Sequence, residues 1–320
     1  MTHPSISLIV PVFNSEGSLE ALVDRIATAL RDFKEKELIL VNDGSRDQSW
    51  KVVESLCRKH EWVRGIDLMR NYGQHNAVLA GIRAARHSVS VTLDDDLQNP
   101  PEEIPRMVAL LESQVDVVYG VPQKQQHGLL RDLASSITKL TLKHAMGAEI
   151  AQNISAFRVF RTQLRDAFAD HRSPTVNVDV LLTWGTTRFA MVRVQHDQRA
   201  VGVTNYTFRK LLAHAFNMMT GFSTLPLQLA SVVGFGFTLF GVGVLMFVVI
   251  RYFLSGDSVP GFPFLASIIA MFSGAQLLSL GIIGEYLARM HFRTLDKPAY
   301  VVRSGGEQLK PTPVPHALER

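Results

Sequence analysis

The chain has 320 residues, of which 47% are hydrophobic and 19% charged, so it is apolar for a soluble protein yet too charged for a bundle of membrane helices alone. Its 33 Lys and Arg nearly balance 29 Asp and Glu, which argues against a nucleic-acid partner. We interpret the small surplus of basic residues, a net charge of +4, as residues that face the membrane. The single cysteine, Cys57, excludes an internal disulfide, and the apolar helical pattern around it favours a structural thiol.

Strands and helices are predicted to alternate along the first 120 residues. Apolar, β-rich runs predict strands at 5–14, 37–41, 63–68, 89–93 and 115–119. Helical periodicity predicts helices at 19–30 and from about residues 48, 73 and 101. This βαβ series predicts an α/β fold with a mostly parallel sheet, helices on both faces and ligands at the carboxyl ends of the strands. The sequence lacks the glycine motifs of dinucleotide oxidoreductases and P-loop ATPases, which argues against both classes.

Two long stretches without charged residues follow this globular part. No Asp, Glu, Lys or Arg occurs at 211–250 or 258–284, and the apolar segments 225–254 and 262–290 are each long enough to cross a bilayer. They predict a two-span transmembrane hairpin, with a buried hydrophobic helical hairpin as the alternative. The loop between the spans lacks Lys and Arg while both outer flanks are basic, so the positive-inside rule places both termini in the cytoplasm. The N-terminus has no signal-peptide pattern, which agrees with a cytosolic first domain.

The expected organisation has four parts. They are a cytosolic domain at 1–206, an amphipathic interfacial helix at 207–221, the two-span hairpin at 222–290 and a cytosolic C-terminal tail at 291–320. Packing against a core is the alternative for the amphipathic helix. The protein is therefore predicted to be a multi-pass protein of the cytoplasmic (inner) membrane.

Three consecutive aspartates follow the fourth predicted strand. Strand alternation places Asp94 and Asp96 on one side and Asp95 on the other, with the amide of Gln98 nearby. Two converging carboxylates repel each other unless a cation compensates, and Mg²⁺ or Mn²⁺ prefers such oxygen ligands. The alternative is a capping role at the next helix, and Asp43 likewise has an ordinary Asp-Gly turn as its alternative.

Four segments together resemble a known family. They read PVFNSEG at 11–17, VNDGSRD at 41–47, RNYGQHNA at 70–77 and LDDDLQNPPEEIP at 93–105. In order and spacing they resemble the family 2 inverting glycosyltransferases, and the paired C-terminal spans narrow the resemblance to the polyprenyl-phosphate glycosyltransferases. The resemblance extends to about Arg303 and implies a GT-A nucleotide-sugar-binding domain. It also implies a nucleotide-diphosphate sugar donor (UDP preferred), a polyprenyl phosphate acceptor such as undecaprenyl phosphate, and a homo-oligomer, namely a tetramer.

The resemblance also implies which residues bind the donor. Pro11, Phe13 and Glu16 match the nucleoside-binding loop, with Phe13 where a tyrosine is usual. Asp43 matches the aspartate that contacts the base.

The D-x-D motif of the family matches Asp94 and Asp96. By this resemblance Asp96 and Gln98 hold Mg²⁺ or Mn²⁺ against the diphosphate. Asp94 belongs to the same metal site and faces the nucleotide and sugar, so both aspartates are catalytic candidates.

The acceptor phosphate is assigned to a basic helix stripe. Arg131 and Ser135 match the family's acceptor-phosphate contacts, and Lys139 and Lys143 continue the same four-residue spacing. A basic stripe beside a membrane suits an anionic lipid head, and a solvated helix face is the alternative for the two lysines.

Three departures from the family pattern bear on mechanism. Arg199 matches a loop that closes on the diphosphate, but Asn205 replaces its usual lysine. Gln152 and Ser155 stand where the family usually has aspartates, one of them a proposed base, next to Arg158, a catalytic candidate for either ligand. Because a lipid phosphate is already anionic at pH 7, we favour a reaction that needs no base. The rival functions are a catalytically silent nucleotide-sugar-binding scaffold and a processive polysaccharide synthase, whose Q-x-x-R-W motif this chain lacks.

Overall fold

The computed structural model describes residues 4–111, 114–122, 154–195, 225–255 and 261–304. The chain divides into two compact units, one formed by residues 1–207 and 297–320 and the other by residues 208–296. We describe each unit by itself.

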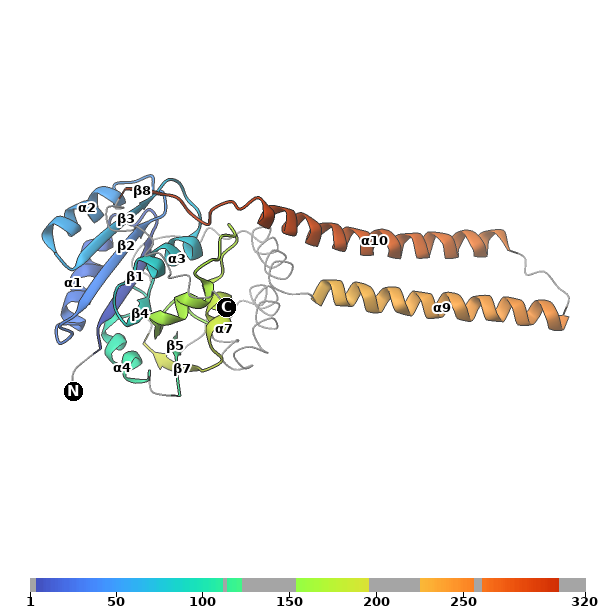
Figure 1. The fold of residues 1–320 in the computed structure, drawn as a ribbon, viewed down its shortest axis with the longest axis horizontal. Helices are drawn as coiled ribbons and strands as arrows, with labels where there is room; N and C mark the ends of the chain where they lie inside the picture. Colours follow the sequence, from blue (N-terminus) through green and yellow to red (C-terminus); the bar gives the residue numbers. More distant parts are fainter. Residues whose placement is uncertain (1–3, 112–113, 123–153, 196–224, 256–260, 305–320) are drawn as a thin grey trace, which may run out of the picture. The chain divides into compact units, whose positions relative to one another are not determined.

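The first unit is built on an eight-stranded sheet with the strand order β7-β5-β6-β4-β1-β2-β3-β8 (Figure 1). The strands are β1 (Ile6–Val12), β2 (Lys36–Asn42), β3 (Val63–Leu68), β4 (Val89–Thr92), β5 (Val117–Pro122), β6 (Arg158–Arg161), β7 (Phe189–Val194) and β8 (Val302–Ser304). Parallel pairs join β1 to β2 and β4, β2 to β3, and β5 to β7. Strand β6 is antiparallel to β4 and β5, and β8 is antiparallel to β3. The prediction of a mostly parallel α/β sheet is therefore confirmed.

Helices pack on both faces of this sheet, as the sequence predicts. They are α1 (Leu19–Ala29), α2 (Ser49–Lys59), α3 (Gln74–Ala84), α4 (Ile104–Ala109) and α7 (Val178–Gly185), with 3-10 turns η1 (Pro101–Glu103) and η2 (Thr162–Phe168). Alternate β1 residues such as Leu8 and Val10 join the core cluster with Leu22 of α1 and Val53 of α2. On the opposite face Ile9 lies so close to Gly81 of α3 that any Cβ at position 81 would collide with it. The close approach of α3 fixes where its first turn meets the carboxyl ends of the strands.

Several short elements have no counterpart in the sequence predictions. Strands β6, β7 and β8 and helix α7 all lie beyond the regular βαβ series. The segment predicted as a C-terminal tail includes β8, and the Val301 carbonyl next to it accepts a 2.9 Å hydrogen bond from the Met69 amide. A three-residue edge strand has too little sequence pattern to be recognised without its partner.

The second unit contains two long helices, α9 (Leu225–Ser255) and α10 (Phe262–Thr294), joined edge-to-face by Phe237 and Phe272 with ring centroids 5.7 Å apart. Within the described residues α9 alone is long and apolar enough to cross a bilayer, over Ala230–Arg251. None of that window is buried, which disfavours the buried-hairpin alternative. The second predicted span is not confirmed, and the predicted interfacial helix at 207–221 lies outside the described residues.

Candidate active site

The loops that follow β1 and β2 are tied to each other at the carboxyl edge of the sheet. The Asn14 amide donates to Ser45 Oγ at 3.0 Å, and the Gln48 amide donates to Glu16 Oε2 at 2.7 Å. Phe13, the residue before Asn14, has 46% of its surface exposed. Glu16 therefore orders the two loops in this structure, while the Phe13 ring is exposed and available for stacking on a planar ligand.

Asp43 is buried and joins the second loop to the 70–73 segment. Its carboxylate accepts hydrogen bonds from the backbone amides of Tyr72 at 2.7 Å and Gly73 at 2.9 Å. Burial raises the pKa of Asp43, and the two amide hydrogen bonds oppose that rise. Gly44, at φ +66°, lies against the Asn71 backbone, where a larger residue would collide. A carboxylate can accept more than two hydrogen bonds, so the base contact implied for Asp43 stays a prediction.

The three aspartates lie beyond β4, which ends at Thr92, and Asp95 and Asp96 are in a turn. The predicted strand alternation therefore does not reach them, and each carboxylate has a different partner. Asp94 Oδ1 accepts a hydrogen bond from the Gln74 side chain, and Asp96 Oδ1 accepts one from the Gln98 amide at 3.1 Å. The prediction that strand alternation places Asp94 and Asp96 on one side is therefore wrong, because the strand ends before these residues.

Asp95 turns back toward the first loop. Its Oδ2 accepts a hydrogen bond from the Phe13 amide at 3.3 Å, and burial raises its pKa. This contact fixes the aspartate turn against the loop that carries the exposed Phe13 ring.

The donor set around Asp94 and Asp96 fits a hard divalent ion that shares its coordination with a substrate. Among the described residues no group of three or more His, Cys, Asp or Glu is placed to hold a metal ion, so a closed site made only by such side chains does not fit. Mg²⁺ commonly binds through one or two carboxylates and completes its coordination with phosphate oxygens and waters. Half-buried carboxylates at the open edge of the sheet suit that arrangement.

A pocket of about 150 Å³ opens beside Asp94. It is lined by Pro11, Thr92 and Leu93 at the ends of β1 and β4, by Gln74, His75 and Val78 of α3, by Ile154, Ser155, Ala156 and Arg158, and by Asp179 of α7. The structure thus brings together four residues that the sequence analysis named, namely Pro11, Asp94, Ser155 and Arg158. Gln74 and Asp179 are pocket residues that the sequence analysis missed.

The floor of this pocket holds a buried ion pair. Arg158 Nη1 lies 2.9 Å from Asp179 Oδ1, and the two side chains are only 4% and 7% exposed. The Tyr119 hydroxyl donates to the same Asp179 oxygen at 2.9 Å. Complete burial and the adjacent carboxylate raise the pKa of Tyr119 well above its ordinary range, so its hydroxyl stays protonated and remains a donor.

His75 of α3 also lines the pocket. Its Nδ1 accepts a 3.3 Å hydrogen bond from the Val178 amide at the start of α7. A neutral imidazole that accepts at Nδ1 carries its proton on Nε2, so His75 is a donor at that atom. The first turn of α7 therefore contacts two pocket side chains, His75 through Val178 and Arg158 through Asp179.

Other predicted site residues lie outside the described residues. They are Arg131, Ser135 and Arg199, together with the departures Gln152 and Asn205. Ser155 is described, and its Oγ accepts a hydrogen bond from the Phe157 amide at 3.1 Å, which stabilises a local turn before β6.

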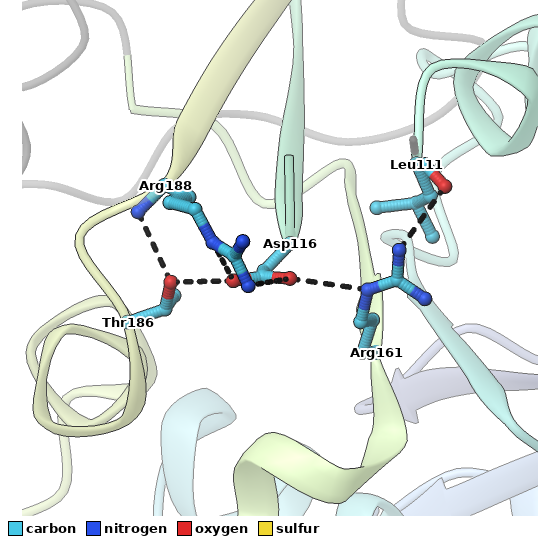
Figure 2. A network of polar contacts seen from close by, with 5 residues as sticks. All are labelled: Leu111, Asp116, Arg161, Thr186 and Arg188. Carbon is cyan, nitrogen blue, oxygen red and sulfur yellow. Dashed lines mark hydrogen bonds and ion pairs between the residues drawn. The ribbon is translucent and has the colours of Figure 1, made fainter. Parts of the chain in front are cut away.

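A second buried aspartate, Asp116, lies at the amino end of β5 (Figure 2). The pocket lies instead at the carboxyl end of β4. Arg161 Nε donates to Asp116 Oδ1 at 3.1 Å, while Arg188 Nε and Thr186 Oγ1 donate to Oδ2 at 2.9 Å and 2.7 Å. A further Arg161 nitrogen donates to the Leu111 carbonyl at 3.3 Å. Although burial opposes it, these hydrogen bonds hold the pKa of Asp116 below its ordinary value. The network ties β5 to β6 and to the residues before β7.

Comparisons with known proteins identify the family of the chain. The family description "Glycosyl transferase family 2" matches residues 7–170. An undecaprenyl-phosphate 4-deoxy-4-formamido-L-arabinose transferase of Shewanella sediminis is 35% identical over 302 residues, which cover 93% of this chain and 91% of the relative. A protein of the same name from Pseudomonas aeruginosa is 33% identical over 319 residues, covering 98% and 94%.

Solved structures show the same fold. Glucosyl-3-phosphoglycerate synthase from Mycobacterium tuberculosis, in complex with Mn²⁺, UDP and phosphoglyceric acid, matches with a TM-score of 0.52 and 19% identity. The match covers 68% of this chain and 76% of that chain. At this identity the likeness establishes the GT-A fold alone.

Proposed function

The chain belongs to glycosyl transferase family 2, and on that premise we propose that it transfers a sugar from a nucleotide diphosphate to undecaprenyl phosphate or a similar polyprenyl phosphate, with inversion at the anomeric carbon. The observation that carries the proposal is the pocket at the carboxyl ends of β1 and β4, which the Asp94 carboxylate and the buried Arg158 guanidinium both line. Relatives named as undecaprenyl-phosphate sugar transferases over nearly the whole chain support the acceptor class. Among the possible nucleotide carriers of the sugar we propose UDP.

The donor is expected to lie across the loops after β1, β2 and β4. The exposed Phe13 ring offers a stacking surface for the base beside Asp43, and Arg199 is assigned to the diphosphate. Asp94, Asp96 and Gln98 would hold Mg²⁺ or Mn²⁺ against the nucleotide. When bound, the ion neutralises charge that develops on the leaving diphosphate.

The acceptor phosphate supplies the nucleophile. One of its oxygens forms a bond to the anomeric carbon from the face opposite the leaving group, and the bond from that carbon to the diphosphate oxygen breaks. A phosphomonoester has a second pKa of about 6 and is already anionic at pH 7, so no protein base has to remove a proton. Arg131, Ser135 and Arg158 are the proposed phosphate contacts, and their role is to position and neutralise.

The membrane anchor is part of the proposal. We assign α9 and α10 to a two-span hairpin with both termini in the cytoplasm, supported by the exposed apolar surface of α9. The protein is expected to form homo-oligomers. Single cysteines placed within residues 256–260 and near the C-terminus should differ in labelling by an impermeant thiol reagent applied to intact cells, with only the cysteine between the two proposed spans labelled.

The function is tested with purified full-length protein, Mn²⁺, undecaprenyl phosphate and a panel of UDP- and GDP-sugars. We expect lipid-dependent release of nucleotide diphosphate from one donor and a glycosylated lipid phosphate of matching mass. Asp96→Ala should abolish the lipid-dependent signal. Equal residual release by both proteins would contradict the enzymatic proposal and favour a binding scaffold.

A further inference from the structure

The Arg158 guanidinium has unused hydrogen-bonding capacity although it is buried. Among the described residues neither its Nε nor its Nη1 has a hydrogen-bond acceptor. The Nη1 is close enough to Asp179 for an ion pair, but the two groups are not aligned for a hydrogen bond. A buried donor without an acceptor costs about 1–3 kcal/mol, more when charged, so such a group needs an explanation.

The surrounding structure fixes this guanidinium in place. Arg158 and Tyr119 are register partners on the adjacent strands β6 and β5. The Tyr119 hydroxyl donates to Asp179 Oδ1, and Asp179 lies in the first turn of α7, whose N-terminus Asn177 caps by accepting from the Val180 amide at 3.1 Å. Helix α7 and strands β5 and β6 thus all contribute to the position of one side chain.

We infer that Asp179, held by Tyr119, is a positioning residue that keeps the Arg158 guanidinium in the pocket with its Nε and Nη1 donors directed to an anionic phosphate oxygen of a substrate. The inference rests on the proposed function and adds to it two residues, 179 and 119, that the family resemblance does not assign. The phosphate belongs either to the lipid acceptor or to the nucleotide diphosphate. Both present the same chemistry to a guanidinium.

The charge of Asp179 is what the inference requires. A carboxylate holds a guanidinium by charge as well as by contact, whereas an asparagine of the same shape keeps an acceptor oxygen for Tyr119 and loses the charge. Asp179→Asn therefore leaves the packing in place and loosens Arg158. Asp116→Asn is the matched control, because it makes the same change at a buried aspartate that also pairs with arginines but lies away from the pocket.

The test is a double-mutant cycle on the full-length protein, with Asp179→Asn, Arg158→Lys and the double variant. If Asp179 acts through Arg158, Asp179→Asn lowers kcat/KM by about 10- to 100-fold in the wild-type background and by less than about threefold in the Arg158→Lys background. Asp116→Asn changes kcat/KM by less than about threefold in either background. Unfolding temperatures of all variants report whether each protein is folded.

Two further measurements identify the phosphate. A raised KM for undecaprenyl phosphate with unchanged UDP affinity in the presence of Mn²⁺ assigns the lipid phosphate, and weakened UDP binding assigns the nucleotide; either result supports the inference. Equal losses from Asp179→Asn in both backgrounds, or no loss in either, would overturn it. A wild-type protein without lipid-dependent transfer would overturn the proposed function and this inference with it, whereas an active wild type with equal losses would overturn only the inference.

Discussion

Two buried aspartates of the sheet domain pair with arginines that differ in their exposure to solvent. Asp116, at the amino end of β5, accepts from Arg161, Arg188 and Thr186, and its two arginines remain 34% and 51% exposed (Figure 2). Asp179, at the pocket, accepts from Tyr119 and faces an arginine that is 4% exposed and has donors left over.

We interpret the Asp116 network as structural and propose that the Arg158 network contacts a substrate. Around Asp116 both carboxylate oxygens accept hydrogen bonds and the arginine charges are shared with solvent, so the arrangement is satisfied by itself. Around Arg158 a desolvated charge is left with unused donors, which is unfavourable unless a ligand completes it. Substitutions around Arg158 should therefore reduce sugar transfer, whereas substitutions around Asp116 should reduce stability.

The largest effect on transfer is expected from substitution of Asp96, a proposed metal ligand. Asp96→Asn removes a charge proposed to hold the divalent ion, so kcat for lipid-dependent transfer should fall by about a hundredfold or more, as should wild-type activity after chelation with EDTA. Asp116→Asn is the control and should keep its activity. Transfer by Asp96→Asn that stays within about threefold of wild type would show that this residue is not a metal ligand.

Replacing each arginine by lysine should distinguish the networks next. Arg158→Lys keeps the charge but loses the planar fork, which should cost about 1.5–3 kcal/mol of transition-state stabilisation, or roughly a 10- to 150-fold loss in kcat/KM. Arg188→Lys, at Asp116, should leave kcat/KM within about twofold. The measurement is initial-rate kinetics with both substrates varied, and equal effects of the two substitutions would remove the distinction.

Asp116→Asn should reveal itself in stability. Loss of its hydrogen-bonded charge should lower the free energy of unfolding by about 1–3 kcal/mol at pH 7. Because the folded-state pKa of Asp116 is depressed, its contribution is present above the unfolded value of about 4 and is lost as pH falls through the lower folded value. Urea midpoints of wild type and variant should therefore converge from pH 7 toward pH 3, and a pH-independent gap would contradict this assignment.

The smallest effects concern single hydroxyl groups. Tyr119→Phe and Thr186→Val each remove one donor to a buried aspartate, and each should cost about 0.5–1.5 kcal/mol of stability. Only Tyr119→Phe should also lower kcat/KM, by about two- to tenfold. Paired unfolding and activity measurements decide the point, and a Thr186→Val protein with the same loss of activity would weaken the comparison.

Much of the fold could be predicted from the sequence because the first five strands are apolar and separated by amphipathic helices. The spacing of apolar residues and the breaks between apolar runs are local properties of the sequence, so β1 through β5 fall near their predicted ranges. Strand β6 has four residues and β8 has three, and both are defined by their partners. The pairing of β8 with β3 joins segments more than 200 residues apart, which no local pattern records.

The site divides in the same way. Asp94 was found because it follows a predicted strand and Arg158 because it matches the family motif, but β4 ends at Thr92 and the expected alternation does not reach the aspartates. Asp179 was missed because it lies in the mainly apolar segment 176–182, for which the sequence analysis predicted no element and assigned no motif. An acid within such a run is itself a signal, since a buried carboxylate requires a partner, although the partner Arg158 can be named only from the structure.

The central claim is that glycosyl transfer takes place at the pocket beside Asp94. It is tested most directly by determining the structure of the full-length protein with UDP and Mn²⁺ and locating the ion by its anomalous scattering. We expect one Mn²⁺ peak in contact with Asp96 and the UDP diphosphate, with the base beside Phe13 and Asp43. UDP bound at another face, or a Mn²⁺ peak away from the aspartate turn, would contradict it.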